Sequence, residues 1–388
     1  MEKIKYFVPK EELEAMAVKQ IEETADLEFV HGLAVMPDAH VGMGSTVGSV
    51  IATKNAIIPA AVGVDIGCGM IAVKTKYFGN DLGDDLKSLR LGIERRIPLS
   101  AGKYNTNLTE SAIERIKKLK ERELPHYQEV VNHPWENQLG SLGSGNHFIE
   151  ICLDEDNRVW VVLHSGSRGI GNKLAERHIK IAQRLMTEAG TLPPNKDLAA
   201  LYATDGEYSD YVTDLLWAQD FALLNREEMM DRVMKELSYY FFKEDGHQSE
   251  IEIDRINCHH NFTQCEHHQG MEMMITRKGA IEMKQGQLGI IPGSMGTRSY
   301  IVEGLGNPES FNSAPHGAGR RFSRTEARRR FTMEDFEREL AGVEVNHSSE
   351  FIDEIPSAYK DIDKVMEYAE PLVQVKHVLK QILNIKGN

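Results

Sequence analysis

The fold of this chain is decided by residues 33–75, which read LAVMPDAHVGMGSTVGSVIATKNAIIPAAVGVDIGCGMIAVKT. Short apolar runs alternate here with glycines and other small residues. This pattern predicts short buried strands joined by tight turns. The same pattern returns after residue 251, in IEIDRINCHH, MEMMITRKGA, GQLGIIPGSMG and RSYIVEG. If the two glycine-rich parts form one site, residues far apart in the sequence must meet.

Helical spacing and many charged residues mark residues 79–133 and 170–242, which lie between and beside these strand regions. The sequence shows no internal repeat and no low-complexity linker. We therefore expect an α+β fold in which residues 1–388 form a single large domain. A mainly helical insert is expected at about 170–250.

The composition narrows the class of protein. The chain has 388 residues, with 59 acidic and 45 basic side chains and a formal net charge of -14. This acidic balance argues against nonspecific coating of polyanions, although it allows a nucleic-acid enzyme with a local basic site. No apolar run approaches the roughly 18 residues of a membrane span, the N-terminus has no secretory h-region, and four cysteines make no disulfide framework. We expect a cytoplasmic protein without a membrane partner.

Candidate metal ligands end several of the predicted strands, each beside glycine or another small residue. Each of these cysteine, histidine and aspartate residues, considered alone, could equally have a structural role in the core or in a turn, without binding a metal. Together they offer oxygen, sulfur and nitrogen, a mixture that suits Mn, Fe, Co or Zn. Five ligands exceed one tetrahedral zinc site, whereas two ions that share a thiolate accommodate them. The candidates are Asp65, Cys68, His147, His164 and one of His259 or His260.

A candidate nucleophile, His316, lies among small residues in PHGAGR. A neutral imidazole there can attack phosphorus, and the nearby arginines Arg320, Arg321 and Arg324 can neutralise phosphate charge. The alternative interpretation is that His316 is a turn histidine without a chemical role, next to a basic helix on the surface. A second glycine-rich loop, PGSMGT at 292–297, lacks the lysine of a Walker A motif and is a weak signal by itself.

Eight motifs, in order along the chain, resemble those of the RtcB-type RNA-splicing ligases. They are VMPDAHVGMGSTVGSV, IIPAAVGVDIGCGM, LGSGNHFIE, LHSGSRGIGN, NCHHN, IIPGSMG, HGAGR and the closing IKG. The resemblance implies a core of mixed, stacked β-sheets surrounded by helices. It also implies an RNA ligase that uses GTP and two Mn²⁺ ions. Such an enzyme joins an RNA 3′-phosphate or 2′,3′-cyclic phosphate end to a 5′-hydroxyl end.

The resemblance assigns roles residue by residue. His316 matches the family's guanylylated, catalytic histidine, and the histidine–asparagine pair selects His260 over His259. The implied metal ligands are therefore Asp65, Cys68, His147, His164 and His260. The implied guanylate-binding positions are Asn146, His147, Phe148, Ile149, Glu150, His260, Asn261, Pro292, Gly293, Ser294, Met295, Ser299, His316, Gly317, Ala318, Gly319 and Lys386.

Two positions depart from the family pattern. Residue 315 is proline where cysteine or serine is expected, and Met43 replaces what is often lysine or an aromatic residue. Neither is an expected ligand. Arg320 and Arg324 are the expected RNA contacts in the basic segment at 320–330.

The sequence leaves several questions open. The implied partners are RNA and GTP, and the RNA could come from tRNA splicing or from RNA repair. Some family members need an accessory activating protein, and the sequence does not decide whether this chain does. Two other functions share some of these features: a two-metal phosphoesterase or nuclease, and a noncatalytic RNA-end-binding protein.

Overall fold

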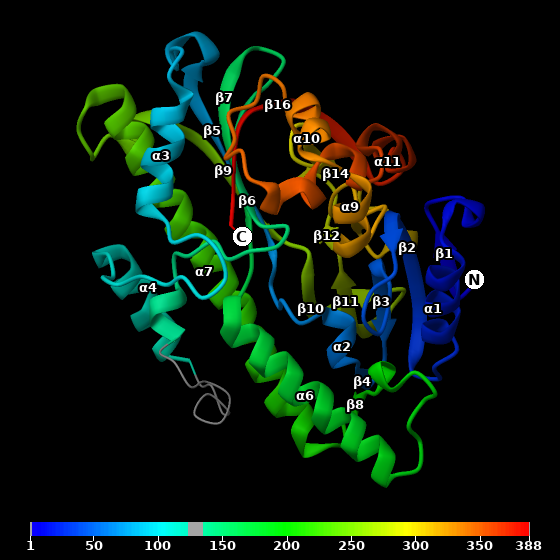
Figure 1. The fold of residues 1–388 in the computed structure, drawn as a ribbon. Helices are drawn as coiled ribbons and strands as arrows, with labels where there is room; N and C mark the ends of the chain where they lie inside the picture. The colour runs from blue at the N-terminus through cyan, green and yellow to red at the C-terminus, as the bar shows by residue number, and fades with distance from the viewer. Residues whose placement is uncertain (1, 123–134, 388) are drawn as a thin grey trace.

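A computed structural model describes residues 2–122 and 135–387 (Figure 1). Its largest sheet has seven strands. Each strand runs antiparallel to its neighbours, and the order is β13-β14-β16-β6-β7-β5-β9. The strands are β5 (Gly69–Phe78), β6 (Phe148–Leu153), β7 (Arg158–Ser165), β9 (Glu252–His259), β13 (Leu288–Pro292), β14 (Arg298–Gly304) and β16 (Val373–Lys386). The last strand of the described residues, β16, thus lies inside the sheet and not at its edge.

A second sheet has five strands in the order β1-β2-β3-β11-β10. It is mixed, because β1 runs parallel to β2 while the other pairs are antiparallel. Its strands are β1 (Ile4–Tyr6), β2 (Val30–His40), β3 (Val47–Thr53), β10 (Asn261–His268) and β11 (Met271–Lys278). Two short pairs complete the strands of the described residues: β4 (Ala56–Ile57) with β8 (Leu201–Tyr202), and β12 (Ala280–Glu282) with β15 (Ser313–Pro315).

The two larger sheets are stacked on one hydrophobic core. Met36 and Ala52 of the five-stranded sheet belong to the same buried cluster as Ala72, Phe148 and Val162 of the seven-stranded sheet. Successive side chains of a strand point to opposite faces, so the intervening residues reach the outer faces. This confirms the α+β fold with mixed, stacked sheets that the sequence predicts.

Helices cover both outer faces. Ile71 and Ile149 pack with residues of α3 and α7, and Val35 and Ile51 pack with residues of α1, α6 and the start of α7. The helices are α1 (Ala15–Ala25), α2 (Pro59–Val62), α3 (Leu86–Arg96), α4 (Glu110–Lys120), α6 (Arg168–Glu188), α7 (Gly206–Phe242), α8 (Gln248–Ile251), α9 (Arg324–Arg330), α10 (Met333–Glu339) and α11 (Ile362–Tyr368). The fold therefore encloses each sheet between the shared core and a helical layer.

The helical stretches of the sequence correspond to these elements. The part from 168 to 251 holds α6, α7 and α8, together with the two-residue strand β8. The part from 79 to 122 holds α3 and α4, whereas residues 123–133 of the stretch expected to be helical lie outside the described residues. In the described part of the chain, no helix is both long enough and apolar enough to cross a bilayer.

Candidate metal and nucleotide site

The candidate metal ligands meet at one edge of the seven-stranded sheet. Strands β5 and β6 begin at this edge, and their antiparallel neighbours β7 and β9 end there, as the pairs Gly69–Ser165, Gly69–His259 and Phe148–His164 show. Asp65 and Cys68 precede β5, His147 precedes β6, His164 lies at the end of β7, and His260 follows β9. The antiparallel topology thus gathers residues almost two hundred positions apart.

The ligand atoms of this cluster are close together and mostly buried. The Cys68 Sγ lies 3.4 Å from His147 Nε2 and 3.2 Å from His164 Nε2. These three ligand atoms all lie within 4.8 Å of one another. His147 Nε2 is 3.0 Å from Asp65 Oδ2, and His164 Nε2 is 2.8 Å from His260 Nε2. The structure therefore brings all five candidates together in one chain of contacts.

Each imidazole is oriented through its other ring nitrogen. The Nδ1 of His147 lies 2.9 Å from the carbonyl oxygen of Leu142, and that of His164 lies 3.1 Å from the carbonyl oxygen of Asn146. The Nδ1 of His260 lies 3.2 Å from Oδ1 of its neighbour Asn261. An Nδ1–H that donates to such an oxygen leaves the Nε2 lone pair free, as in histidines that bind metals. All three Nε2 atoms point into the cluster.

The surroundings of the cluster favour the neutral form of two of its imidazoles, those of His164 and His260. Burial lowers the pKa of His164 and of His260 well below the ordinary value, with further lowering from neighbouring histidines. Burial and the Asp65 charge raise the pKa of the Cys68 thiol well above its usual range. A bound cation acts in the opposite direction on a thiol and favours the thiolate. One thiol, one carboxylate and three imidazoles around one point thus have the chemistry of a transition-metal site.

Two details of the cluster differ from simple strand alternation. His147 lies just before β6 begins, so its side chain reaches Cys68 although Ile149, two residues later, packs on the opposite face toward α7. His259 and His260 are separated by the end of β9. The Nδ1 of His259 lies 2.7 Å from the carbonyl oxygen of Gly67, whereas His260 faces His164. Residue spacing alone leaves this choice open.

Glycine allows the carboxylate of Asp65 to fit. The backbone N–H of Ser167 donates to Asp65 Oδ1 at 3.0 Å. A Cβ atom at Gly166 would overlap the Asp65 carboxylate, so the small residue after His164–Ser165 makes room for this ligand. The loop after β7 therefore holds Asp65 with its backbone.

His316 lies directly after β15 and beside the cluster. Its ring centroid is 4.8 Å from that of His260. Its Nδ1 lies 2.6 Å from Oδ2 of Asp38, and its backbone N–H donates to the same oxygen at 3.2 Å. Asp38 belongs to β2 and is fully buried. Sequence reasoning missed Asp38, although the motif VMPDAH contains it, because no spacing links residues 38 and 316.

A cavity of about 300 Å³ opens in front of His316 and the cluster. Most of the expected guanylate-binding positions line it, together with residues that sequence reasoning did not assign to the nucleotide. The expected ones are Asn146, Phe148, His260, Asn261, Pro292, Gly293, Ser294, Met295, His316, Gly317, Ala318, Gly319 and Lys386. The others are His40, Val47, His164, Lys278, Arg320, Arg324, Glu354 and Tyr359.

Four expected guanylate positions are absent from the cavity lining. One of them, His147, contributes its Nε2 to the ligand cluster. Ile149 is fully buried in the core beneath α7. Glu150 is also buried, and its Oε1 accepts a hydrogen bond from Asn384 at 3.0 Å. Burial raises the pKa of Glu150 to about 8, although the charge of Lys386 opposes this shift. Ser299 is buried on β14, paired with Pro292.

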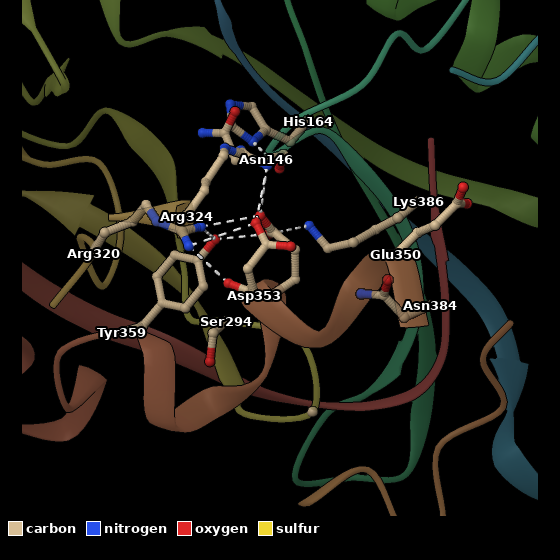
Figure 2. A network of polar contacts seen from close by, with 12 residues as sticks. Asn146, His164, Ser294, Arg320, Arg324, Glu350, Asp353, Tyr359, Asn384 and Lys386 are labelled. Atoms are coloured by element: carbon tan, nitrogen blue, oxygen red, sulfur yellow. Dashed lines mark hydrogen bonds and ion pairs between the residues drawn. The ribbon is translucent and has the colours of Figure 1, made fainter. Parts of the chain in front are cut away.

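Three cations of the cavity, Arg320, Arg324 and Lys386, converge on the neighbouring carboxylates of Asp353 and Glu354. Arg320 and Arg324 pair with Asp353 (Figure 2). Glu354 accepts from Lys386 at 2.7 Å and lies 3.0 Å from Arg320 Nη1 and 3.2 Å from Arg324 Nη1. Burial opposes ionisation of Glu354, but these cations outweigh it and lower its pKa. The two arginines expected to bind RNA thus line the cavity and are already paired with carboxylates.

Lys278 is a further cavity residue that sequence reasoning missed. It is the last residue of β11, and burial lowers its pKa to about 8. Its Nζ donates to the carbonyl oxygen of Ala60 at 3.2 Å and to that of Met43. The half-exposed Met43 therefore contributes its backbone to the site. Pro315 pairs with Ala280 across the short sheet next to His316.

Comparison with known proteins shows which family this chain is similar to. The profile of a family described as tRNA-splicing ligase RtcB matches residues 20–387. The chain is 46% identical over 390 residues to the RNA-splicing ligase RtcB of Escherichia coli K12, with 97% of this chain and 95% of the relative covered. It is 30% identical to the tRNA-splicing ligase RtcB of Pyrobaculum aerophilum, with 89% and 85% covered. The corresponding protein of Aeropyrum pernix is 29% identical, with 90% and 87% covered.

Proposed function

This chain belongs to the RtcB family of tRNA-splicing ligases, and we propose on that premise that it joins RNA ends. In this proposal an RNA 3′-phosphate is sealed to a 5′-hydroxyl with GTP as the energy source. A 2′,3′-cyclic phosphate end is first hydrolysed to the 3′-phosphate. Two Mn²⁺ ions are the proposed metals.

The donor set supports the metal part of the proposal. Cys68 lies between His147 and His164, so its thiolate can serve two ions, with Asp65 completing one side and His260 the other. Such ions, when bound, would supply Lewis-acid stabilisation of phosphate charge. The chain itself contributes imidazoles that are fixed by their Nδ1 contacts.

His316 is the proposed nucleophile toward GTP. With Nδ1–H donating to Asp38, the Nε2 lone pair is available for attack on the α-phosphorus. A bond forms between Nε2 and phosphorus, the bond to the β-phosphate oxygen breaks, and pyrophosphate leaves. The Asp38 carboxylate stabilises the positive charge that the ring acquires. The product is a guanylyl group on His316.

Two transfers complete the reaction. An oxygen of the RNA 3′-phosphate attacks the guanylyl phosphorus, and His316 leaves as a neutral imidazole. The RNA then ends in a 3′-pp-5′-G linkage. The 5′-hydroxyl of the second RNA attacks the RNA-side phosphorus, its proton goes to solvent, and GMP leaves. The phosphate at the new junction is therefore the one that the first RNA brought.

The cavity supplies binding groups for the nucleotide. The glycine-rich segments 292–295 and 317–319 can bring backbone N–H groups close to phosphate oxygens. Lys386 lines the cavity and is proposed to meet the guanine or its sugar. Glu150, for which the resemblance implies the same role, is buried outside the cavity lining, so no direct contact with the nucleotide is proposed for it. Arg320 and Arg324 are proposed to meet the RNA phosphate after exchanging their pairing with Glu354.

One observation carries this proposal: a buried carboxylate, Asp38, orients a histidine that lies between a Cys–His cluster and a nucleotide-sized cavity. A phosphoesterase would need the cluster but not a histidine held in this way. The natural RNA is proposed to be a tRNA splicing or repair intermediate in the cytoplasm. The free thiols at Cys68, Cys152, Cys258 and Cys265 fit a reducing compartment.

The test is ligation by the purified chain of an RNA pair with 3′-phosphate and 5′-hydroxyl ends. We expect joined product only when both GTP and Mn²⁺ are present, and none from His316→Ala. Joining without GTP, or cleavage without joining, would contradict the proposal. Activity of the chain alone would also show that no accessory protein is required.

A further inference from the structure

Two neighbouring side chains of α7, Asn225 and Arg226, are fully buried against the edge of the sheet where the candidate ligands meet. They lie in the middle of α7, which carries none of the sequence motifs described above. Both are polar, and neither lines the cavity. Their hydrogen bonds explain why they are buried there.

Arg226 binds the backbone directly before Cys68 and directly after His164. Its Nη1 donates to the carbonyl oxygen of Gly67 at 2.8 Å and to that of Ser165 at 3.1 Å. Gly67 directly precedes Cys68, and Ser165 directly follows His164. One guanidinium thus fixes the distance between two segments that each carry a candidate ligand.

The same guanidinium reaches the strand that leads to His260. Its Nε donates to Oδ1 of Asn257 at 2.8 Å. Its Nη2 lies 3.1 Å from His259 Nδ1, which also lies 2.7 Å from the carbonyl oxygen of Gly67. The amide oxygen and the two carbonyl oxygens that accept from Arg226 are neutral groups. A buried cation among neutral acceptors is costly unless its hydrogen bonds are satisfied. The guanidinium suits this position because it offers five N–H donors in a fixed plane.

Asn225 connects two more loops. Its Oδ1 accepts from the backbone N–H groups of Gly140 at 2.7 Å and Ser141 at 3.3 Å. Its Nδ2 donates to the carbonyl oxygens of Ser141 at 3.3 Å and Gly166 at 3.1 Å. The first loop continues to Leu142, whose carbonyl oxygen orients His147, and Gly166 adjoins the Asp65 carboxylate.

We propose that Asn225 and Arg226 are positioning residues that set the spacing of the metal ligands from α7. Between them they bind the segments next to Cys68, His164 and His260, and the loop that orients His147. The proposal rests on the proposed function in that the ligand cluster holds a metal. If α7 were merely anchored by these bonds, their loss would lower stability without changing metal affinity.

The test uses Co²⁺, whose binding to a thiolate gives a charge-transfer band that does not depend on ligase activity. We expect the unmodified chain to bind Co²⁺ with this band. Arg226→Met and Asn225→Asp should weaken Co²⁺ binding by roughly 10–100-fold, the usual effect of losing an outer-shell partner. Arg226→Lys keeps the charge but has fewer hydrogen-bond donors. Its Co²⁺ affinity should therefore lie between those of the unmodified chain and Arg226→Met.

Arg96→Met is the matched control. Arg96 also pairs with a carboxylate of α7, Glu236, and with Asp245, and both lie at the C-terminal end of α7 or beyond it. Arg96→Met should lower the stability of the fold to urea and leave the Co²⁺ affinity unchanged. If Arg226→Met does not fold, Arg226→Lys and Asn225→Asp decide the question.

Two results would overturn the inference, and they are distinguishable. If Arg226→Lys and Asn225→Asp fold and bind Co²⁺ with the affinity and spectrum of the unmodified chain, the positioning role is refuted. The metal centre itself would then still stand. Absence of the cobalt–thiolate band from the unmodified chain would instead refute the metal centre itself.

Discussion

Nδ1 of His316 lies 2.6 Å from Oδ2 of Asp38, a carboxylate with no exposed surface that also accepts the backbone N–H of His316. The two residues are 278 positions apart in the chain. This contact fixes which ring nitrogen of His316 faces the cavity, and it places a negative charge behind the ring.

Asp38→Asn should slow self-guanylylation by roughly 100-fold or more. The amide oxygen can still accept both hydrogen bonds, but it lacks the charge that stabilises the ring once phosphorus is bound. The rate of label transfer from α-labelled GTP at saturating nucleotide measures this. An unchanged rate would mean that Asp38 has only a structural role.

The covalent adduct should be labile in acid and stable in alkali. Protonation of a phosphoramidate nitrogen makes the imidazole a better leaving group, so the guanylyl label on His316 should be lost at low pH. Treatment of the labelled protein with acid and with alkali, followed by gel analysis, tests this. A label that survives acid but not alkali would exclude histidine as the attachment site.

Glu150→Gln should change how stability depends on pH. Glu150 has an ordinary pKa of 4.5 that the fold raises to about 8, so folding takes up a proton between these values. The free energy of unfolding of the unmodified chain should therefore fall as pH rises through this range, by roughly 1.4 kcal/mol for each pH unit attributable to this group.

Urea unfolding without nucleotide, at several pH values, measures the free energy of unfolding of Glu150→Gln. The control is Glu334→Gln, which changes an exposed carboxylate of α10. The glutamine at residue 150 stays neutral, so its variant should gain stability relative to the unmodified chain as pH rises. Parallel pH profiles for all three proteins would show that Glu150 is ionised throughout.

Arg324→Ala should impair RNA joining more than self-guanylylation, by about tenfold or more. Arg324 lines the cavity, and its partner Glu354 can also pair with Lys386 and Arg320. Arg328→Ala is the matched control. Arg324 and Arg328 both pair with Asp353, but Arg328 does not line the cavity. Equal loss in both steps would argue against a separate role of Arg324 toward RNA.

The sequence predicts the strands and the identity of the clustered residues well, because the apolar runs that end at His164 and before His260 are local patterns. It does not predict that β16 lies between β14 and β6, since pairing between distant strands leaves no local signal. The choice of His260 over His259 depends on where β9 ends, which spacing does not define.

Residues that act across the fold were missed for the same reason. Asp38, Glu354 and Arg226 are conspicuous only once their partners are in place. The expected RNA contacts Arg320 and Arg324 read as a solvated basic segment in the sequence, whereas the structure pairs both with buried carboxylates. Which charged side chains are paired depends on contacts between distant parts of the chain, and a single sequence does not reveal these contacts.

The position of β16 has a consequence for biosynthesis. While a ribosome is still translating residues before 373, β6 has no partner on one side and the β13–β14 hairpin has none for β14. The nascent chain then exposes two sheet edges, and Lys386 has not yet reached the cavity. Closing of the sheet and completion of the cavity are therefore a single late event in the synthesis of the chain.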